Sequence, residues 1–281
     1  MRVTRRRPEW RVTAIARDTY ALEQKSPYAQ CVDYLLVGRD RAAVIDTGLA
    51  SRGALRSVVT ALTDRPVDVW LTHGHADHIG HAGEFGAAYL HEADRPVQAA
   101  HSDPAFLKRL LREEMGAALA AVARPVVRRV TAIPPADYRW FGDDQVFDLG
   151  GREVTVVPVP GHTPGSVCYL DQATGGLFTG DSCCDWGVLL HLEFCLPPAV
   201  YLESARRLLG LQRAGAFRFN WPGHHGFPAA ADLPEQYAAC AESIADGSGV
   251  VRPRRHHAVV RYRDVLITLP RTYLAQPVGR R

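Results

Sequence analysis

Residues 72–78 have the sequence Thr-His-Gly-His-Ala-Asp-His and directly follow a short apolar run, 67–71, that is typical of a buried strand. The first two histidines of this run are two residues apart, so in an extended chain their side chains point the same way. Two imidazoles placed like this can occupy two corners of a metal coordination sphere. Asp77 and His78 follow where the chain is expected to turn into a helix, and their side chains suit zinc, iron or manganese. The run therefore predicts a metal site.

The composition is that of an ordinary globular protein. The chain has 281 residues, of which 47% are hydrophobic and 22% charged, and its formal net charge is +3. This length allows a single α/β domain over residues 1–281, with a core from about 12 to 270, that buries most of its apolar surface. Arginine clusters near both ends are interpreted as solvated surface, because the charge balance is far from strongly basic. No nucleic-acid partner is expected.

The cysteines and the first residues favour a reduced, cytoplasmic setting. A basic start is followed by Pro8 and Glu9 and not by the apolar stretch of a secretory signal. Six cysteines are present, and the pair Cys183-Cys184 lacks the spacing of a thiolate zinc site. Disulfides are not expected. The apolar runs are too short and too interrupted to cross a bilayer, so no membrane association is expected.

Strand-like and helix-like patterns interleave along the whole chain, which indicates an α/β layer architecture. Strands are expected at 10–22, 32–37, 42–45, 67–71, 144–149, 154–159, 167–170, 176–179 and 217–221, and a strand pair at 258–269. Helices are expected at 55–62, 105–123, 199–211 and 234–245.

Five short motifs occur in an order that resembles the metallo-β-lactamase-fold hydrolases. The run 73–78 matches the H-x-H-x-D-H signature of that family. The other matches are Asp46 in Ile-Asp-Thr-Gly, His162 in Gly-His-Thr-Pro-Gly, Asp181 in Thr-Gly-Asp and His224 in Pro-Gly-His. The resemblance covers roughly residues 12 to 270 and implies a four-layer αββα sandwich. It is far more specific for the fold and the metal site than for the substrate.

The resemblance also implies a ligand set for two divalent metal ions, with zinc favoured over iron or manganese. Metal one would be bound by His73, His75 and His162. Metal two would be bound by Asp77, His78 and His224, and Asp181 would bridge the two ions. Asp46 is expected to orient the ligand loop, as residues behind metal ligands usually do. His225 is adjacent to His224 and either could bind, although the pattern favours His224.

The chemistry that follows is metal-assisted hydrolysis of a small molecule. Two cations lower the pKa of a bridging water, and the resulting hydroxide attacks a carbonyl that one ion polarises. Asp77 and Asp181 are the expected catalytic carboxylates, and Asp77 could receive the proton of that water. No Gly-x-Ser-x-Gly motif is present. The leading hypothesis is a hydrolase of a thioester, a lactone or a related acyl compound, similar to the glyoxalase II and lactonase branches.

Other functions of the same fold remain as alternatives. A persulfide dioxygenase with one iron resembles the same motifs. A nuclease is less favoured because no concentrated basic exosite is evident, and a non-catalytic metal-binding protein is less favoured because all seven ligands are present. True β-lactamases of this fold usually lack an Asp at the position of Asp181. Flavodiiron oxidoreductases carry Glu where this chain has His75.

Several properties stay open at this level. The sequence does not identify the substrate or the native metal. It does not determine the oligomeric state either, and it is compatible with a homo-oligomer. Cys183 and Cys184 follow Asp181 closely, but small buried cysteines in a core turn are the favoured interpretation. His81, His191 and Tyr201 could reach a substrate, although each is more simply a structural residue.

Overall fold

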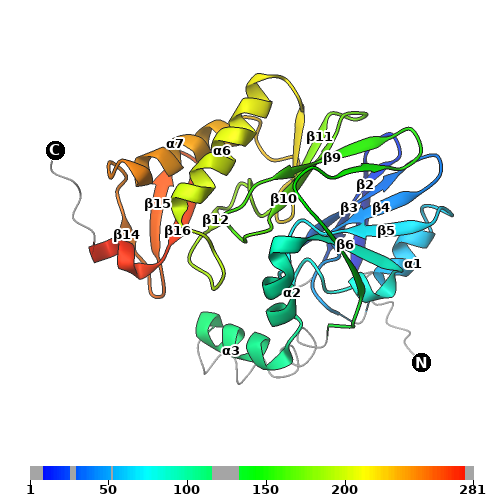
Figure 1. Cartoon of the computed structure of the whole chain (residues 1–281), viewed down its shortest axis with the longest axis horizontal. Coiled ribbons are helices and arrows are strands. Elements are labelled where there is room, and N and C mark those ends of the chain that lie inside the picture. The colour runs from blue at the N-terminus through cyan, green and yellow to red at the C-terminus, as the bar shows by residue number, and fades with distance from the viewer. Residues whose placement is uncertain (1–8, 26–29, 52, 116–132, 276–281) are drawn as a thin grey trace, which may run out of the picture.

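Two β-sheets form the centre of the protein, and helices cover them on both sides (Figure 1). The computed structural model describes residues 9–25, 30–51, 53–115 and 133–275. The first sheet has seven strands in chain order: β1 (Trp10–Ala16), β2 (Thr19–Gln24), β3 (Val32–Val37), β4 (Ala42–Ile45), β5 (Val67–Trp70), β6 (Ala87–His91) and β7 (Asp137–Phe141). Strands β1 to β4 pair antiparallel, whereas β4 to β7 pair parallel.

The second sheet has five strands in the order β13-β11-β10-β9-β8. Its members are β8 (Val146–Asp148), β9 (Glu153–Pro158), β10 (Val167–Asp171), β11 (Gly176–Gly180) and β13 (Phe219–Pro222). One apolar cluster joins its inner face to that of the seven-stranded sheet, and Tyr34, Trp70, Tyr169 and Phe178 are among its fully buried members. Burial of such large side chains is the main stabilising contribution to this interface.

Helices complete the outer layers. Helix α1 (Leu55–Thr60) packs Leu55 and Val59 on the outer face of the first sheet. Helices α6 (Pro198–Arg213) and α7 (Leu233–Ala245) pack on the second sheet and on a third, four-stranded sheet. The strands of this third sheet are β12 (Val188–Leu189), β16 (Val265–Leu269), β15 (Ala258–Tyr262) and β14 (Arg252–Pro253). The layer order of helix, sheet, sheet and helix confirms the predicted α/β sandwich.

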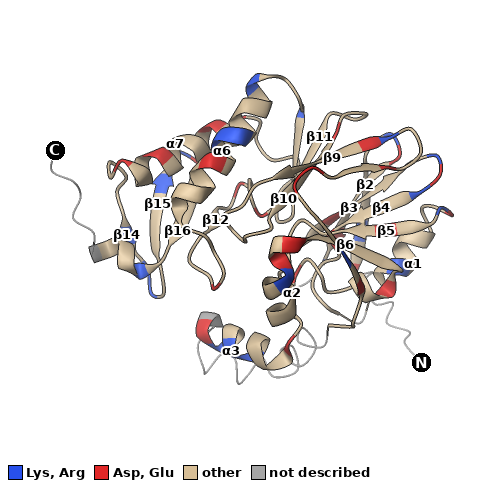
Figure 2. Cartoon of the chain, in the orientation of Figure 1, with Lys and Arg blue, Asp and Glu red and all other residues tan. Residues whose placement is uncertain are grey.

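The remaining helical elements lie near the first sheet or at the end of the described chain. They are η1 (Ala82–Glu84), η2 (Glu92–Asp94), α2 (Arg95–His101), α3 (Pro104–Met115) and η3 (Arg271–Ala275). None of the helices in the described residues is long and apolar enough to cross a membrane. On the outer surface, Arg206 of α6 forms ion pairs with Glu203 and with Glu242 of α7, and Figure 2 shows both signs of charge on this pair of helices.

Most predicted elements occur within two or three residues of their expected bounds, but the single strand expected at 10–22 is wrong. The chain reverses at Asp18, whose φ is 52°, and forms the hairpin of β1 and β2 with Ala16 opposite Thr19. Regular alternation holds only from Trp10 to Ala14, and the three consecutive polar residues 17–19 mark the turn that the prediction of one strand passed over. Strands β6 and β7 and helix α2 were not predicted. The helix expected at 105–123 is described as α3, and its residues beyond 115 lie outside the described part of the chain.

Candidate metal centre

The sequence motifs meet where strands of the two central sheets end. Asp46 follows β4, the run 72–78 follows β5, His162 follows β9, Asp181 follows β11 and His224 follows β13. Parallel pairing of β4 with β5 and of β11 with β13 brings the carboxyl ends of these strands together. Ligand sites of α/β sheets commonly form at such ends. The arrangement thus draws one site from both sheets.

Two buried tyrosines tie the ligand loops to the opposite sheet. The hydroxyl of Tyr169 on β10 donates to the carbonyl of Leu71, 2.8 Å away, just before the histidine run. The hydroxyl of Tyr34 on β3 donates to the carbonyl of Pro222, 2.7 Å away, just before His224. Each bond provides a donor for a buried carbonyl at the end of a strand. The starts of the two loops are therefore fixed relative to each other.

Glycines let two of these loops approach closely. Gly180 has a φ of +49°, and a Cβ atom there would lie 2.5 Å from Oγ1 of Thr72. A Cβ atom at Gly223 would lie 2.9 Å from Cε1 of His78. Side chains at these positions would push the second sheet away from the histidine run.

The first group of side chains consists of three buried imidazoles. His73, His75 and His162 are each at most 4% exposed, and their ligand atoms lie within 4.8 Å of one another. Nδ1 of His75 faces Nε2 of His162 at 3.0 Å. This is the set that the family resemblance implies for metal one.

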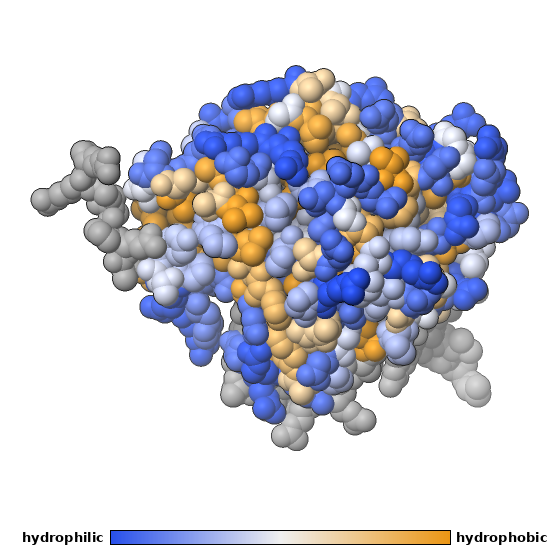
Figure 3. Space-filling view, viewed as in Figure 1, coloured by the Kyte–Doolittle hydropathy of each residue, from blue (hydrophilic) through white to orange (hydrophobic). Residues whose placement is uncertain are grey.

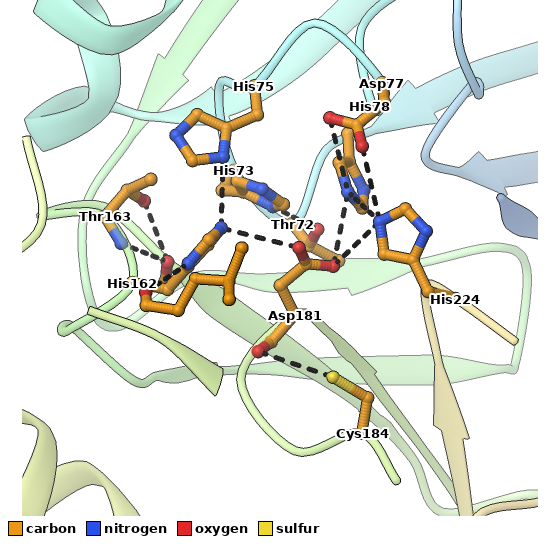
Figure 4. A network of polar contacts seen from close by, with 12 residues as sticks. Thr72, His73, His75, Asp77, His78, His162, Thr163, Asp181, Cys184 and His224 are labelled. Carbon is orange, nitrogen blue, oxygen red and sulfur yellow. Dashed lines mark hydrogen bonds and ion pairs between the residues drawn. The ribbon is translucent and has the colours of Figure 1, made fainter. Parts of the chain in front are cut away.

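The second group combines carboxylates with imidazoles (Figure 4). Nε2 of His78 and Nε2 of His224 lie 3.2 Å apart, and Asp77 Oδ2 is 3.4 Å from His224 Nε2. Asp181 lies between the groups: its Oδ1 is 3.3 Å from Nε2 of both His78 and His224, and its Oδ2 is 3.4 Å from His162 Nε2. The structure thus brings all seven predicted ligands together, with one carboxylate facing both groups.

Hydrogen bonds behind the site fix the orientation of the rings that come from the histidine run. Asp46 accepts from the backbone N–H of Thr72 at 2.8 Å and from its hydroxyl at 2.7 Å. Because that hydroxyl donates to Asp46, it accepts from Nδ1 of His73, 3.0 Å away. Nδ1 of His78 donates to the same carboxylate at 2.8 Å. Both rings therefore present Nε2 to the centre of the site.

Backbone carbonyls fix the ring orientation of the two histidines that follow strands of the second sheet, His162 and His224. Nδ1 of His162 donates to the carbonyl of Leu189 at 2.8 Å. Nδ1 of His224 donates to the carbonyl of Gln30 at 3.2 Å. With Nδ1 bonded to a carbonyl in each ring, Nε2 faces the cluster, which is the arrangement found behind most metal-binding histidines.

Burial and charge divide the site into two halves. Burial and the neighbouring imidazoles lower the pKa of His73 and His75 well below the usual value. These rings are neutral at neutral pH, which is the form that binds metals. Burial also disfavours the charged form of His78 and His224, but the surrounding carboxylates raise the pKa of both well above the usual value. One half is thus rich in neutral imidazole and the other in negative charge.

The donor set fits divalent metal ions. Nε2 of His73 and Nε2 of His75 are buried and have no hydrogen-bond partner among the described residues. Such atoms are costly to bury unless something compensates them. Imidazole nitrogen and carboxylate oxygen are ligands for zinc, iron and manganese. The residues present therefore suit the ions that the sequence implied.

The bonds of Asp46 lead to a testable expectation. In Asp46→Asn, an amide replaces the carboxylate that accepts from Thr72 and His78, so one of these donors loses its partner. Metal affinity is expected to fall roughly 10–100-fold, the usual effect of losing a partner behind the ligands. Competition with a chromophoric chelator measures it. Asp64→Asn, at a carboxylate that is 96% exposed, is the control. Equal affinities in the two variants would contradict this role.

Sequence reasoning missed Asp94, which is fully buried at the start of α2. It accepts from the backbone N–H of Gly74 at 2.7 Å, from the hydroxyl of Thr163 at 2.8 Å and from the N–H of Gly165 at 2.6 Å. One carboxylate thereby connects the loop of His75 to the loop of His162. Its position before Arg-Pro resembles a helix N-cap, but its side chain makes no cap bond because it serves these loops.

His101 belongs to none of the sequence motifs, yet the structure places it beside the site. It is 5% exposed, and its ring lies 4.4 Å from that of His75. Nδ1 accepts from the backbone N–H of Ala76 at 3.2 Å, so a neutral ring carries its proton on Nε2. Burial lowers the pKa of His101 to about 4. No spacing rule connects residue 101 to the run 72–78, and only the fold brings them together.

The remaining candidates lie outside the cluster. His225 is exposed and bonds Gln30, so His224 and not His225 lies in the cluster of predicted ligands. Three further side chains bond structural partners: His81 contacts Glu84, His191 contacts Thr268, and the hydroxyl of Tyr201 donates to the carbonyl of Ser182. Cys183 and Cys184 are fully buried, which agrees with small core residues.

Comparison with known proteins gives the same family as the motifs. The model of the metallo-beta-lactamase superfamily matches residues 28–209. Acyl-coenzyme A thioesterase MBLAC2 of Bos taurus is 31% identical over 204 residues, which is 68% of this chain and 71% of that protein. The protein of the same name from Homo sapiens is 30% identical over 202 residues and covers the same shares.

Solved structures show the same fold. A metallo-beta-lactamase family protein from Thermus thermophilus superposes with a TM-score of 0.58 at 23% identity, over 84% of this chain and 82% of that one. A metallo-beta-lactamase from Pontibacter korlensis gives 0.59 at 17% identity, over 83% and 99% of the two chains. Motif order, layer order and the superfamily match agree, and the chain belongs to the metallo-beta-lactamase superfamily.

Proposed function

We propose that the protein is a metal-dependent hydrolase of acyl thioesters. Membership of the superfamily and the thioesterase names of its relatives support a hydrolase of this type. The observation that carries the proposal is the place of Asp181, whose two carboxylate oxygens face different groups of ligand side chains. A carboxylate in this position suits two ions held side by side, with zinc favoured by the imidazole-rich donor set.

Two divalent ions, when bound, would supply Lewis acidity that polarises an acyl carbonyl and lowers the pKa of water toward neutrality. His73, His75 and His162 would hold one ion, and Asp77, His78 and His224 the other, with Asp181 between them. Because hydrogen bonds fix the orientation of the ligand nitrogens, the proposed metal site is preformed. Such preorganisation contributes to catalysis because little rearrangement accompanies the reaction.

Asp77 differs from the other six ligands in its access to solvent. Its side chain is 33% exposed, whereas that of Asp181 is 8% exposed and the histidines are buried. We therefore infer that substrate and water reach the site past Asp77. At this opening its carboxylate can accept the proton of the attacking water and pass it to the leaving thiolate.

Aromatic side chains flank the ligand cluster and suit an apolar acyl group. Trp186 lies with its ring 5.9 Å from that of His224. On the other side, Phe106 of α3 packs 5.1 Å from His101 and 6.1 Å from Phe194. Figure 3 shows apolar residues between polar margins on the face that carries α3. Apolar side chains around a few polar groups are typical of the surroundings of a bound small molecule.

The test combines metal analysis with a substrate panel. Native protein is expected to contain divalent metal and to hydrolyse acyl-coenzyme A thioesters, with release of free thiol followed by a thiol reagent. A chelator is expected to remove this activity and added Zn²⁺ to restore it. Lactones, phosphodiesters and β-lactams serve as comparison substrates.

The same panel separates the competing functions. Failure of the metal-loaded protein on every thioester would refute the proposed substrate class. Oxygen uptake with glutathione persulfide, together with iron as the bound metal, would instead support a dioxygenase. Salt-sensitive cleavage of RNA would support a nuclease.

A further inference from the structure

Cys31 lies beside the ligand cluster although it belongs to none of the motifs. It directly precedes β3 and forms an isolated antiparallel bridge with His224. The backbone N–H of Val32 donates to the carbonyl of Gly223 at 2.8 Å. Cys31 is 1% exposed. Backbone pairing therefore holds its side chain next to one of the predicted ligands.

The thiol takes part in a compact group of possible metal donors. Sγ of Cys31, a carboxylate oxygen of Asp77 and a ring nitrogen of His224 all lie within 4.8 Å of one another. The thiol and the imidazole of His224 are in hydrogen-bonding contact. Three donors at this separation are close enough to converge on one cation after small side-chain movements.

A second observation points to a ligand in the same space. Oδ1 of Asp181 is buried, and its polar contacts among the described residues are the ring nitrogens of His78 and His224, which are themselves predicted metal ligands. It lies 3.3 Å from Nε2 of His224, the ring that contacts Cys31. An ion at this position would compensate the carboxylate and lie within reach of the thiol.

Three of the other cysteines whose contacts are described use their thiols differently. Cys184, Cys195 and Cys240 direct Sγ toward backbone carbonyls, at 3.2 Å from Gly187, 3.1 Å from His162 and 3.8 Å from Val260, respectively. Among the described residues, Cys31 is the only cysteine in a group of candidate metal donors.

We propose that the thiolate of Cys31 is an additional protein ligand at the ion held by Asp77, His78 and His224. This inference rests on the metal site of the proposed function. On binding, the S–H bond breaks, a bond from sulfur to the cation forms, and the proton leaves to solvent with no change in oxidation state. Thiolate is a soft ligand that favours Zn²⁺, Co²⁺ or Cd²⁺ over Mg²⁺ or Mn²⁺.

The protonation state of the Cys31 thiol depends on whether a cation is bound. Burial raises the pKa of Cys31 to about 12 in the protein without a cation, so sulfur is then protonated. A bound dication deprotonates a coordinating thiol outright. The consequence is two chemically different ions, one among imidazoles and one that also binds sulfur.

The test uses the full chain loaded with Co²⁺. A thiolate bound to Co²⁺ gives a charge-transfer absorption band in the near ultraviolet, whereas nitrogen and oxygen ligands give only visible bands. The wild-type protein is expected to show both. In Cys31→Ser the near-ultraviolet band is expected to be lost while the visible bands remain. Cys240→Ser, at a buried thiol on α7, is the matched control and should keep both.

Each outcome decides a different question. Visible bands without a charge-transfer band in the wild-type protein would refute Cys31 as a ligand and leave the hydrolase proposal standing. Persistence of the band in Cys31→Ser would also refute it. No Co²⁺ binding at all would overturn both the thiolate ligand and the metal site. Cadmium NMR of the wild-type protein, which reports sulfur ligation without a variant, decides the question if Cys31→Ser does not fold.

Discussion

Replacement of His75 with alanine is expected to abolish metal-dependent turnover. The side chain is 4% exposed, and its Nδ1 lies 3.0 Å from Nε2 of His162, so it belongs to the centre of the three-imidazole group. Alanine leaves that ion with one protein ligand fewer in a buried space. The measurements are bound metal per chain and thioester hydrolysis at saturating Zn²⁺.

His225→Ala is the matched control for this prediction. It removes an exposed imidazole from the residue next to a ligand. We expect it to retain both metal ions and full activity. Full activity in His75→Ala would refute the ligand assignment, and loss of activity in both variants would show that the assay responds to any nearby histidine.

Removal of the Asp171 carboxylate is expected to have the largest effect on stability. This residue ends β10, is fully buried, and accepts from the guanidinium of Arg152 at 2.6 Å. Arg152 also donates to the carbonyls of Asp18 and Val37 and to the hydroxyl of Thr19, so it connects the second sheet to the first. In Asp171→Ala the buried guanidinium loses its counter-ion, at a cost of about 3–5 kcal/mol in the free energy of unfolding.

Urea denaturation of the metal-free protein measures this cost through the transition midpoint. Asp137→Ala is the control, because Asp137 pairs with Arg139 at the surface, where both side chains are more than half exposed. That change is expected to cost about 0–1 kcal/mol. Replacing Arg152 and Asp171 together by apolar residues should recover part of the loss. Equal losses at positions 137 and 171 would contradict the difference in burial.

Local patterns predicted much of the fold. Strands β3 and β4 occur at their expected bounds because β3 is apolar apart from Asp33, β4 is fully apolar, and the turn residues 38–41 separate them. The hairpin of β1 and β2 was not separated, because its turn is short and carries neither Gly nor Pro, so the polar residues 17–19 are compatible with one strand. Strand β6 is a short run of mixed character whose burial comes from its parallel neighbours β5 and β7, and that pairing is not local.

The ligand cluster was predictable for a different reason. Its seven side chains lie in four short motifs with their own spacing and order, so the family resemblance could identify them from the sequence alone. Asp94 and Cys31 carry no such signal. Asp94 acts on Gly74 and Gly165, far away in the chain, and Cys31 reaches His224 through a single backbone bridge. Contacts of this kind follow from sheet register, which the sequence pattern alone does not determine.

The origin of the predicted ligands in loops of two separate sheets would give bound metal ions a mechanical role. The run 72–78 belongs to one sheet, whereas His162, Asp181 and His224 belong to the other. Ions bound between them would act as cross-links that the unfolded chain does not form, so their binding energy would add to the stability of the sandwich. Loss of metal would then loosen the seam between the sheets at the same time as it stops catalysis, and the supply of ions would control both the activity and the lifetime of the protein.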